Sequence, residues 1–375
     1  MFRHPIRVNL PRSAVSVLKR GAHDLLTYSN RPPALRKGIE GRSAISGHTI
    51  TVFGASGFLG RYIVSKLAKS GSSVVIPYRD DYDIRHLRVS GDLGAVVQLE
   101  WDLRNEQQIA ECLRHSDTVY NLVGLDYETK NFKWKDVHVD GAARIARIAR
   151  ENNVARFVQV SHLNASPTST SHYYRAKYEG EQAVLGEFPD AVIVRPSAMY
   201  GHEDRFLNQL GFWDMTFKFN GEQTKVRPVH VIDVAEILYR MLDMPVLPSN
   251  PVNLPGPTTY THEELLNLAR RVTDNPYRSI AIPKSIAKFT SNILQYAIWW
   301  PWFSPDEIER RCIDELDVEG DWDKFGITPT ELEDVAIAYL RRFRDATKID
   351  YNSPLETAKA KRRQNAYYSE PSESS

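Results

Sequence analysis

The feature that most constrains this 375-residue chain is a short β-branched segment followed by a glycine-rich turn and a helical pattern. Residues 49–53 read Thr-Ile-Thr-Val-Phe, which is typical of a buried parallel strand. Apolar residues recur at helical spacing after the turn, up to Gly71. A strand, a tight glycine turn and a helix in this order bring helix N-terminal amides to a pyrophosphate, so the sequence predicts a dinucleotide-binding site. The residues expected at the nucleotide are Gly54, Ser56, Gly57, Phe58, Leu59 and Gly60.

The first charged side chain after the next predicted strand, residues 74–78, is Arg79. An acidic residue at this place binds a ribose 2′-hydroxyl, whereas a guanidinium forms a paired, charge-assisted contact with a 2′-phosphate. Such a contact is worth roughly 1.5–3 kcal/mol, which favours NADPH over NADH by about tenfold or more. Two alternatives stay open: Arg79 lies free in solvent, or Asp80 or Asp81 binds the ribose instead.

Short apolar segments alternate with helical patterns along residues 49–200, which predicts an α/β fold with a Rossmann-type doubly wound parallel sheet. The clearest helical pattern spans residues 137–152. The regularity weakens beyond residue 200, where Pro-rich pieces such as residues 244–257 interrupt it. We expect residues 201–350 to complete the sheet and to form a smaller C-terminal lobe over its ligand-binding edge. Further strands are expected at residues 95–100, 118–123, 156–161 and 191–195.

The chain begins with a basic segment that lacks carboxylates before Asp24. The whole chain has a formal net charge of +1, so the part beyond this segment is net negative. An arginine-bearing, acid-free, amphipathic start is typical of a mitochondrial presequence, and a disordered basic arm is the alternative. We expect a presequence at residues 1–23, a linker at residues 24–48 and a mobile tail at residues 351–375.

Composition excludes several classes of site. Cys112 and Cys312 lie far apart and suggest neither a disulfide framework nor a zinc site, which is compatible with a reducing compartment. His138, His162 and His172 match no metal-ligand spacing and are expected to line a nucleotide cleft. No run of about twenty uncharged apolar residues predicts a membrane-spanning helix. No basic face suits nucleic acid. We therefore expect no metal site and no nucleic-acid partner.

Several short motifs follow one another in a familiar order over residues 48–260. In this order the chain resembles the extended and atypical short-chain dehydrogenase/reductases, and within them it is similar to the NADPH-binding accessory subunits of mitochondrial respiratory complex I. The narrower likeness depends on residues 57–62, residues 76–79 and the presequence-like start. The motifs are the glycine turn, Asp102-Leu103, Asn121-Leu122-Val123-Gly124, Ser161, Tyr173 with Lys177, Arg195-Pro196, Pro228-Val229-His230 with Asp233-Val234-Ala235, and Asn253-Leu254-Pro255-Gly256.

The resemblance implies bound NADPH, other complex I subunits as partners, and a place on the matrix side of the mitochondrial inner membrane. It implies that Asp102 holds the adenine amino group, that Leu122 and Val123 line the adenosine path, and that Lys177 reaches the nicotinamide ribose. Further nucleotide contacts are expected from Leu103, Ser161, Tyr173 and Pro196.

The family's catalytic pair is present, but its partners are incomplete. Tyr173 and Lys177 lie one helical turn apart, as do the general acid and its ammonium neighbour in active reductases. No second Ser or Thr closely follows Ser161, and His138 stands where active relatives tend to have an asparagine. Loss of a carbonyl-polarising donor costs about 3 kcal/mol of transition-state stabilisation. We therefore expect a nucleotide holder with vestigial Tyr173 and Lys177.

Two other functions stay open at this point. One is a free mitochondrial NADPH-dependent reductase acting on a hydrophobic carbonyl substrate. The other is a scaffold whose affinity for its partners responds to NADPH. The aromatic-rich segment from Ile286 to Phe303 favours a partner or lipid-surface contact for any of these, and core of the small lobe is the alternative.

Overall fold

A seven-stranded parallel sheet forms the centre of the molecule. The computed structural model describes residues 46–212, 215–218, 223–244, 247–248, 251–273, 278–297 and 304–344. The strand order is β11-β6-β5-β4-β1-β2-β3, and every neighbouring pair is parallel. The order reverses beside β1, so ligands of such a sheet bind outside the carboxyl ends of β1 and β4. The strands are β1 (Thr49–Phe53), β2 (Ser73–Tyr78), β3 (Val96–Glu100), β4 (Thr118–Asn121), β5 (Arg156–Val160), β6 (Val192–Pro196) and β11 (Val252–Leu254).

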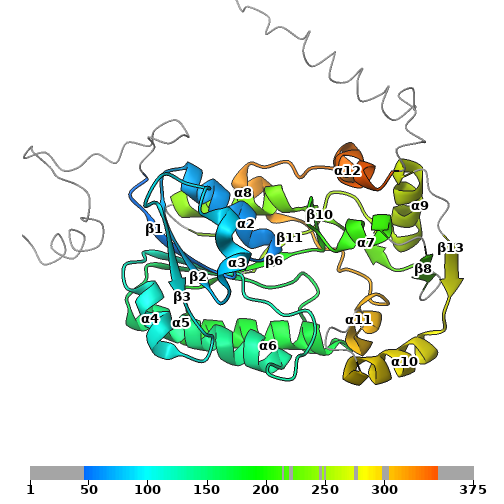
Figure 1. Ribbon diagram of the computed structural model, residues 1–375, viewed down its shortest axis with the longest axis horizontal. Coiled ribbons are helices and arrows are strands. Elements are labelled where there is room, and N and C mark those ends of the chain that lie inside the picture. The colour runs from blue at the N-terminus through cyan, green and yellow to red at the C-terminus, as the bar shows by residue number, and fades with distance from the viewer. Residues whose placement is uncertain are drawn as a thin grey trace, which may run out of the picture.

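Helices cover both faces of this sheet (Figure 1). One face carries α2 and α8, which pack against each other, and the other carries α4, α5 and α6. Side-chain caps start α4 and α6, because Asn105 and Ser171 accept hydrogen bonds from the first-turn amides. The bounds are α2 (Phe58–Lys69), α3 (Asp81–Ile84), α4 (Glu106–Leu113), α5 (Ala142–Glu151), α6 (His172–Glu187) and α8 (Val231–Asp243), with a 3-10 turn η1 (Arg85–Leu87) after α3.

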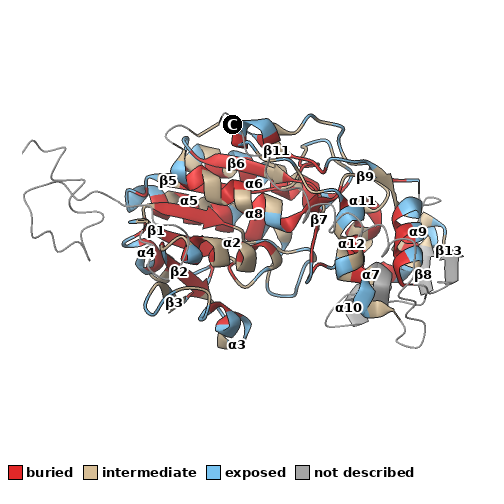
Figure 2. Cartoon of the chain, turned by 90° about the horizontal axis from the view of Figure 1, so that it is seen from above, coloured by how far each residue is buried: buried red, intermediate tan, exposed pale blue. Residues whose placement is uncertain are grey.

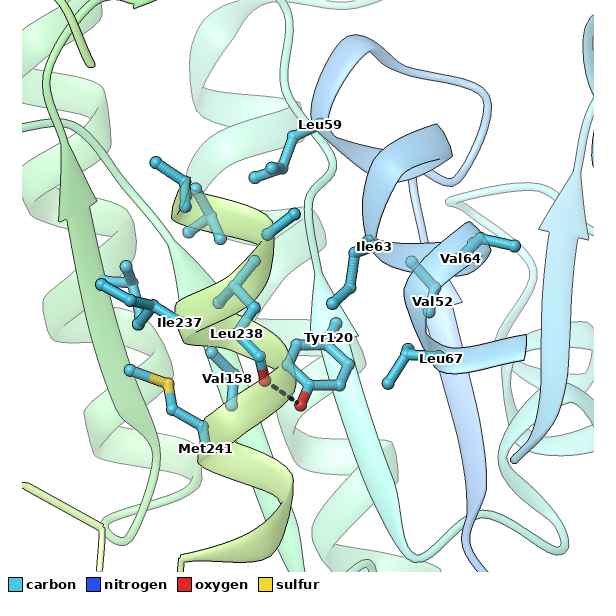
Figure 3. Packing of buried hydrophobic residues seen from close by; sticks show 14 of the residues in the cluster. Val52, Leu59, Ile63, Val64, Leu67, Tyr120, Val158, Ile237, Leu238 and Met241 are labelled. Atoms are coloured by element: carbon cyan, nitrogen blue, oxygen red, sulfur yellow. Dashed lines mark hydrogen bonds between the residues drawn. The ribbon is translucent and has the colours of Figure 1, made fainter. Parts of the chain in front are cut away.

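The first core cluster lies between the sheet and the α2–α8 pair. Ile63 and Leu67 of α2 meet Leu238 and Met241 of α8 over β-branched strand residues such as Val52 (Figure 3). The hydroxyl of fully buried Tyr120 donates a 2.7 Å hydrogen bond to the backbone carbonyl of Leu238, which satisfies the only polar atom of that side chain. Figure 2 shows that the central strands are buried and that the outer faces of the helices are exposed.

The second core cluster lies between the sheet and helices α4, α5 and α6. The helical segment before α5 is a π-helix, η2 (Lys135–Gly141), and only from Ala142 does the chain continue as α5. The helical stretch predicted at residues 137–152 is observed, but it is π-helical up to Gly141 and α-helical only beyond it. π-helical turns occur often at functional sites, and this one carries His138.

A smaller C-terminal lobe follows β6 and lies beyond one end of the sheet (Figure 1). Its own core joins α7, α9 and α12, and a separate small cluster joins α10 to α11 through Ala287 and Ile308. The helical elements are α7 (Phe206–Phe212), α9 (His262–Thr273), α10 (Lys284–Ala297), α11 (Pro305–Arg310), η4 (Asp321–Phe325), α12 (Leu332–Leu340) and η5 (Arg341–Phe343). The strands are β7 (Met199–Tyr200), β8 (Met215–Lys218), β9 (Lys225–Val226), β10 (Val229–His230), β12 (Tyr260–Thr261) and β13 (Arg278–Ala281).

The predicted fold class is confirmed, since a doubly wound parallel sheet is observed. Within residues 201–350, β11 pairs with β6 at the edge of the sheet and α8 packs on one of its faces, and β11 falls inside the Pro-rich stretch. The predicted presequence at residues 1–23 and the tail at residues 351–375 lie outside the described residues, as does most of the linker. No helix in the described ranges has the length and apolarity needed to cross a membrane.

Candidate nucleotide-binding site

The glycine turn after β1 has a backbone path that side chains would block. Gly54 has a φ of +80°, and a Cβ atom there would lie 2.9 Å from the backbone carbonyl of Leu122. A Cβ atom on Gly60 would lie only 2.4 Å from the carbonyl oxygen of Gly54, so α2 packs directly on the turn. These positions therefore require glycine, as a phosphate-binding turn does.

The N-terminus of α2 opens on this turn without a competing group. Gly57 is its N-cap, no side chain accepts a hydrogen bond from its first amides, and its first turn holds no acidic residue. The positive end of the helix is therefore available for an anion such as a pyrophosphate. Ser56 and Phe58 are half-buried beside the turn, whereas the Leu59 side chain lies in the first core cluster.

Arg79 lies directly after β2 at the carboxyl edge of the sheet. Its side chain is exposed, and no hydrogen bond or ion pair joins it to another residue in the described part of the chain. Asp80 and Asp81, the two carboxylates that the sequence offers as alternative ribose ligands, both have protein partners. Asp80 is the N-cap of α3 and accepts a 2.9 Å hydrogen bond from the amide of Tyr82. Asp81 forms ion pairs with Arg85 and Arg88.

Asp102 and Leu103 follow β3 but differ in their surroundings. Asp102 is exposed, and its Oδ1 accepts a 2.7 Å hydrogen bond from the amide of Arg104. Leu103 is buried in the second core cluster and packs on Gly141, where a Cβ atom would lie 2.8 Å from the leucine Cδ2. The structure thus places Asp102 at the open edge, while the Leu103 side chain is part of the core.

Leu122 and Val123 follow β4 next to the glycine turn. The amide of Leu122 donates a 2.9 Å hydrogen bond to the carbonyl of Phe53, which ties this segment to β1. The amide of Val123 donates to the Asn121 side chain, whose own amide is held by buried Gln159 at 2.7 Å. Buried amide groups therefore fix the chain where adenosine is expected to pass.

Tyr173 and Lys177 lie on the first two turns of α6, and both side chains are buried. The Lys177 Nζ lies 5.7 Å from the centroid of the Tyr173 ring. His138 from η2 packs edge-on to this ring at 5.4 Å and its Nε2 lies 3.0 Å from the carbonyl oxygen of Leu125. The sequence therefore identified a tyrosine, a lysine and a histidine that the fold brings together.

Burial controls the protonation of this cluster. It lowers the pKa of Lys177 to about 8, although Asp126 and Glu181 act in the opposite direction. Burial and the charge of Lys177 lower the pKa of His138 to about 3, so this imidazole is neutral at physiological pH. Burial also raises the pKa of Tyr173 well above its usual range. Neither neutral His138 nor this protonated phenol supplies a charge that would repel a bound nucleotide.

Ser161 and Pro196 complete the predicted set at the ends of β5 and β6. Both are buried. The Oγ of Ser161 is inaccessible to solvent and has no hydrogen-bond partner among the described residues. A buried hydroxyl without a partner is costly, so this atom fits a polar ligand group supplied from outside the chain. Together with the unobstructed helix end, it indicates that the residues present suit a dinucleotide.

The sequence reasoning missed two side chains from α11 that complete the site. The carboxylate of Asp306 accepts hydrogen bonds from the Ser171 hydroxyl at 2.8 Å and from the His172 amide at 2.7 Å, and so caps α6. Arg310 lies over the ring of Tyr173 at 4.5 Å. Asp306 and Tyr173 lie 133 residues apart in the chain, and the other contacts between α11 and α6 join residues at a similar separation. No local sequence pattern could signal contacts over such a distance.

No group of three or more His, Cys, Asp or Glu residues in the described ranges is arranged to hold a metal ion. The histidines instead pack on aromatic rings: His162 lies 4.8 Å from the ring of Tyr174, and His172 stacks on Trp134 at 6.4 Å.

Comparisons with known proteins agree with this geometry. A family model described as NAD(P)H-binding matches residues 54–245. Two solved structures share the fold at low identity. A nucleoside-diphosphate-sugar epimerase from Staphylococcus aureus has a TM-score of 0.62 at 14% identity, and 78% of this chain and 99% of that one are covered. A Bordetella bronchiseptica enzyme in complex with NAD+ has a TM-score of 0.53 at 16% identity, with 63% and 86% covered.

Relatives with higher sequence identity narrow the family further. The mitochondrial NADH-ubiquinone oxidoreductase 40 kDa subunit of Neurospora crassa is 44% identical over 95% of this chain and 94% of its own length. The NADH dehydrogenase [ubiquinone] 1 alpha subcomplex subunit 9 of Rattus norvegicus is 37% identical over 94% of this chain and 95% of its own. A ceramide reductase from Caulobacter vibrioides is 30% identical over 62% of this chain and 73% of its own.

The match to the NAD(P)H-binding family begins at Gly54, the first residue of the glycine turn, and includes Arg79, Lys177 and α8. The relatives that match over nearly the whole chain extend the likeness through the C-terminal lobe, including α11. The chain therefore belongs to the NAD(P)H-binding family and, within it, to the family of the mitochondrial 40 kDa subunit of NADH-ubiquinone oxidoreductase, also named alpha subcomplex subunit 9.

Proposed function

We propose that this chain is a non-catalytic accessory subunit of mitochondrial complex I that binds NADPH tightly and stabilises the matrix arm near its junction with the membrane. The observation that carries the proposal is the likeness to complex I subunits at 37–44% identity over nearly full length. A ligand that binds only the folded state stabilises it by mass action, by about 4 kcal/mol at a thousandfold excess over its dissociation constant. NADPH therefore supports the subunit without turnover.

The choice of NADPH over NADH rests on Arg79. Its guanidinium is exposed and unpaired among the described residues, while Asp80 and Asp81 are engaged in a helix cap and in ion pairs. Asp80 and Asp81 are therefore less available to a ribose 2′-hydroxyl, whereas a 2′-phosphate would find a cation at Arg79. In this proposal Asp102 holds the adenine amino group, and Lys177 holds the nicotinamide ribose.

The absence of turnover rests on the surroundings of Tyr173. A general acid works best when its pKa lies near the working pH, and burial moves the pKa of Tyr173 away from that range. Arg310 also covers one face of the ring, so the side chain is held between protein groups. The Tyr173–Lys177 pair in this proposal serves to position the nucleotide.

The proposal is tested on complex I purified from mitochondria that produce a tagged form of the chain. Nucleotide released by denaturing the complex is identified by mass spectrometry. We expect about one NADPH for each tagged subunit, with no added nucleotide needed. A complex that contains the tagged chain but releases no NADPH contradicts the proposal. So does a tagged chain that is not recovered in complex I.

A second candidate function is an NADPH-dependent reductase for a hydrophobic carbonyl substrate. The observation in its favour is the likeness to a ceramide reductase at 30% identity over 243 residues. Oxidation of NADPH by the purified chain with long-chain carbonyl substrates, abolished in Tyr173→Phe, would favour this function over the first. We expect no such oxidation.

The predicted lipid or partner contact at Ile286–Phe303 stays part of the proposal. Ile286 and Phe289 on α10 are 56% and 69% exposed, whereas Ala287 is buried against α11. Residues 298–303, which hold its three tryptophans, lie outside the described ranges. The exposed apolar side chains of α10 fit a surface contact better than a core position.

A further inference from the structure

Helix α11 connects the nicotinamide end of the site to the C-terminal lobe through a buried carboxylate. Asp306 is 7% exposed and accepts hydrogen bonds from the Ser171 hydroxyl and the His172 amide, with a longer one from the Tyr173 amide at 3.4 Å. Ser171 itself accepts a hydrogen bond from the amide of Tyr174. The first turn of α6, which carries Tyr173, is therefore held by a residue of another lobe.

Arg310 makes the second contact, one turn further along α11. Its guanidinium carbon lies 4.5 Å from the Tyr173 ring centroid, and its Nη2 donates a 3.0 Å hydrogen bond to the carbonyl oxygen of Asp126. Its Nε lies 3.6 Å from Asp306 and has no hydrogen-bond partner in the described ranges. Arg310 therefore links the Tyr173 ring to the segment at Asp126 and to Asp306 on its own helix.

Helix α11 also contacts α10. Glu309 accepts a 2.9 Å hydrogen bond from Lys284 and forms an ion pair with Lys288, both on α10. Ile308 and Ala287 are buried together between the two helices. These contacts leave the apolar side chains of Ile286 and Phe289 exposed on α10. Successive residues of α11 therefore contact α6 and α10.

From this chain of contacts we infer that α11 couples occupancy of the nucleotide site to the placement of α10. The inference deepens the proposed function and rests on it, because it requires a nucleotide at Tyr173 and Lys177. A nucleotide there restricts the first turn of α6, which fixes the partners of Asp306 and Arg310. A fixed α11 then fixes Lys284 and Lys288 through Glu309, and with them the exposed face of α10.

Thermodynamic linkage gives the coupling a second consequence. If NADPH favours one placement of α10, any partner surface that binds α10 in that placement raises the affinity for NADPH by the same factor. The subunit would then hold its nucleotide more tightly inside an assembly than as a free chain. A ligand shifts such an equilibrium only by its difference in affinity for the two placements.

The test is hydrogen–deuterium exchange on the purified full chain, freed of nucleotide and then reloaded with NADPH. We expect amides of α11 and of residues 284–292 on α10 to exchange roughly threefold or more slowly with NADPH bound. The change Glu309→Gln removes the ion pairs to α10 and leaves the Ile308–Ala287 contact in place, so NADPH should still slow exchange in α11 but slow it less in α10. Glu307→Gln is the matched control, because Glu307 pairs with Arg311, the residue directly after α11, and contacts neither α6 nor α10 through that pair.

The outcomes separate this inference from the proposed function. Isothermal titration on the same samples shows whether NADPH binds at all, and a chain that binds none overturns both. NADPH that binds with no change in α11 exchange overturns the coupling and leaves the proposed function standing. Should Glu309→Gln fail to fold, the double change Lys284→Gln with Lys288→Gln removes the same link from the other helix. Exchange in α10 of that variant that NADPH slows as much as in the wild type would contradict the inference.

Discussion

Arg310 of α11 lies over the ring of Tyr173 on α6, with its guanidinium carbon 4.5 Å from the ring centroid. The ring is thus held by the C-terminal lobe in a place where active short-chain reductases need a free phenol. Burial and the carboxylate of Asp126 raise the pKa of Tyr173, although the charge of Arg310 lowers it. The charge of Arg310 does not offset the effect of burial. This balance fits a residue that holds a nucleotide and does not transfer a proton.

Replacing Arg79 should change which nucleotide the chain prefers. Arg79→Gln removes the only cation directly after β2, so we expect the affinity for NADPH to fall roughly tenfold or more, which corresponds to about 1.4 kcal/mol or more. Affinity for NADH should change less than about threefold, because NADH lacks the 2′-phosphate. Isothermal titration with both nucleotides measures the two affinities.

Arg114→Gln is the matched control for that measurement. Arg114 is another exposed arginine, at the C-terminal end of α4, which lies at the opposite edge of the sheet because α4 leads into the start of β4. Its replacement should leave both affinities unchanged. Equal losses of NADPH and NADH affinity in Arg79→Gln would show that Arg79 contacts some other part of the nucleotide.

The smallest possible side chain at residue 60 should disrupt the turn. In Gly60→Ala, the new Cβ atom would lie 2.4 Å from the carbonyl oxygen of Gly54 and 2.5 Å from that of Ala55. Both are backbone atoms, so α2 must move away from the turn. We expect stability to fall by about 2–4 kcal/mol, since overpacking commonly costs 1–3 kcal/mol and backbone cannot yield as side chains do. Urea denaturation measures the change, and Gly186→Ala on α6 is the control, because its Cβ atom would meet nothing within 4 Å.

How far the sequence predicts this site depends on whether the signal is local. The turn at Gly54 and the placement of Arg79 were readable because two strands, the turn and a helix lie within about thirty residues. The pairing of Tyr173 with Lys177 was readable from helical spacing alone. The contacts of Asp306 with Ser171 and of Arg310 with Tyr173 join segments more than 130 residues apart, and no periodicity encodes them.

Local irregularity accounts for the remaining differences. The apolar pattern at residues 137–152 is helical throughout, but close packing of Gly180 against the backbone of His138 accompanies a π-helical turn there. A Cβ atom on Gly180 would lie 2.1 Å from the His138 carbonyl oxygen, which shows how closely the two segments approach. The short strand β11 was hidden because Pro251 and Pro255 flank its three residues.

Lys177 should make the nucleotide-free chain more stable at alkaline pH. Its pKa is lowered from 10.5 in the unfolded chain to about 8 in the fold. Between pH 8 and 10.5 the unfolded state binds more protons than the folded state. The free energy of unfolding therefore rises with pH through that window, and the gain is lost as the pH falls through 8. The full effect is about 3 kcal/mol. Other lysines and tyrosines titrate in the same pH range. The contribution of Lys177 is therefore isolated only as the difference in unfolding free energy between the wild type and a variant that lacks this lysine.

Lys177→Met supplies that difference, since methionine fills a similar volume without a charge. Denaturation of both nucleotide-free proteins from pH 6.5 to 10 should show the variant more stable below pH 8, with the gap closing as pH rises. A gap that stays constant with pH would mean that Lys177 keeps its ordinary pKa in the fold. The same variant should bind NADPH more weakly, because the group expected at the nicotinamide ribose is gone.

The change Tyr173→Phe separates holding a nucleotide from using it. No hydrogen bond joins the Tyr173 hydroxyl to another described residue, while the ring packs against Arg310 and His138. Phenylalanine keeps both ring contacts, so we expect thermal stability within a few degrees of the wild type and NADPH affinity within about threefold. The amount of assembled complex I on native gels should then be close to normal. Tyr173→Ala removes the ring and should lower both nucleotide affinity and assembly, which shows that the assay responds to this position. If the phenylalanine chain bound NADPH normally and yet failed to support respiration, the hydroxyl would have a chemical role, and the reductase function would replace the structural one.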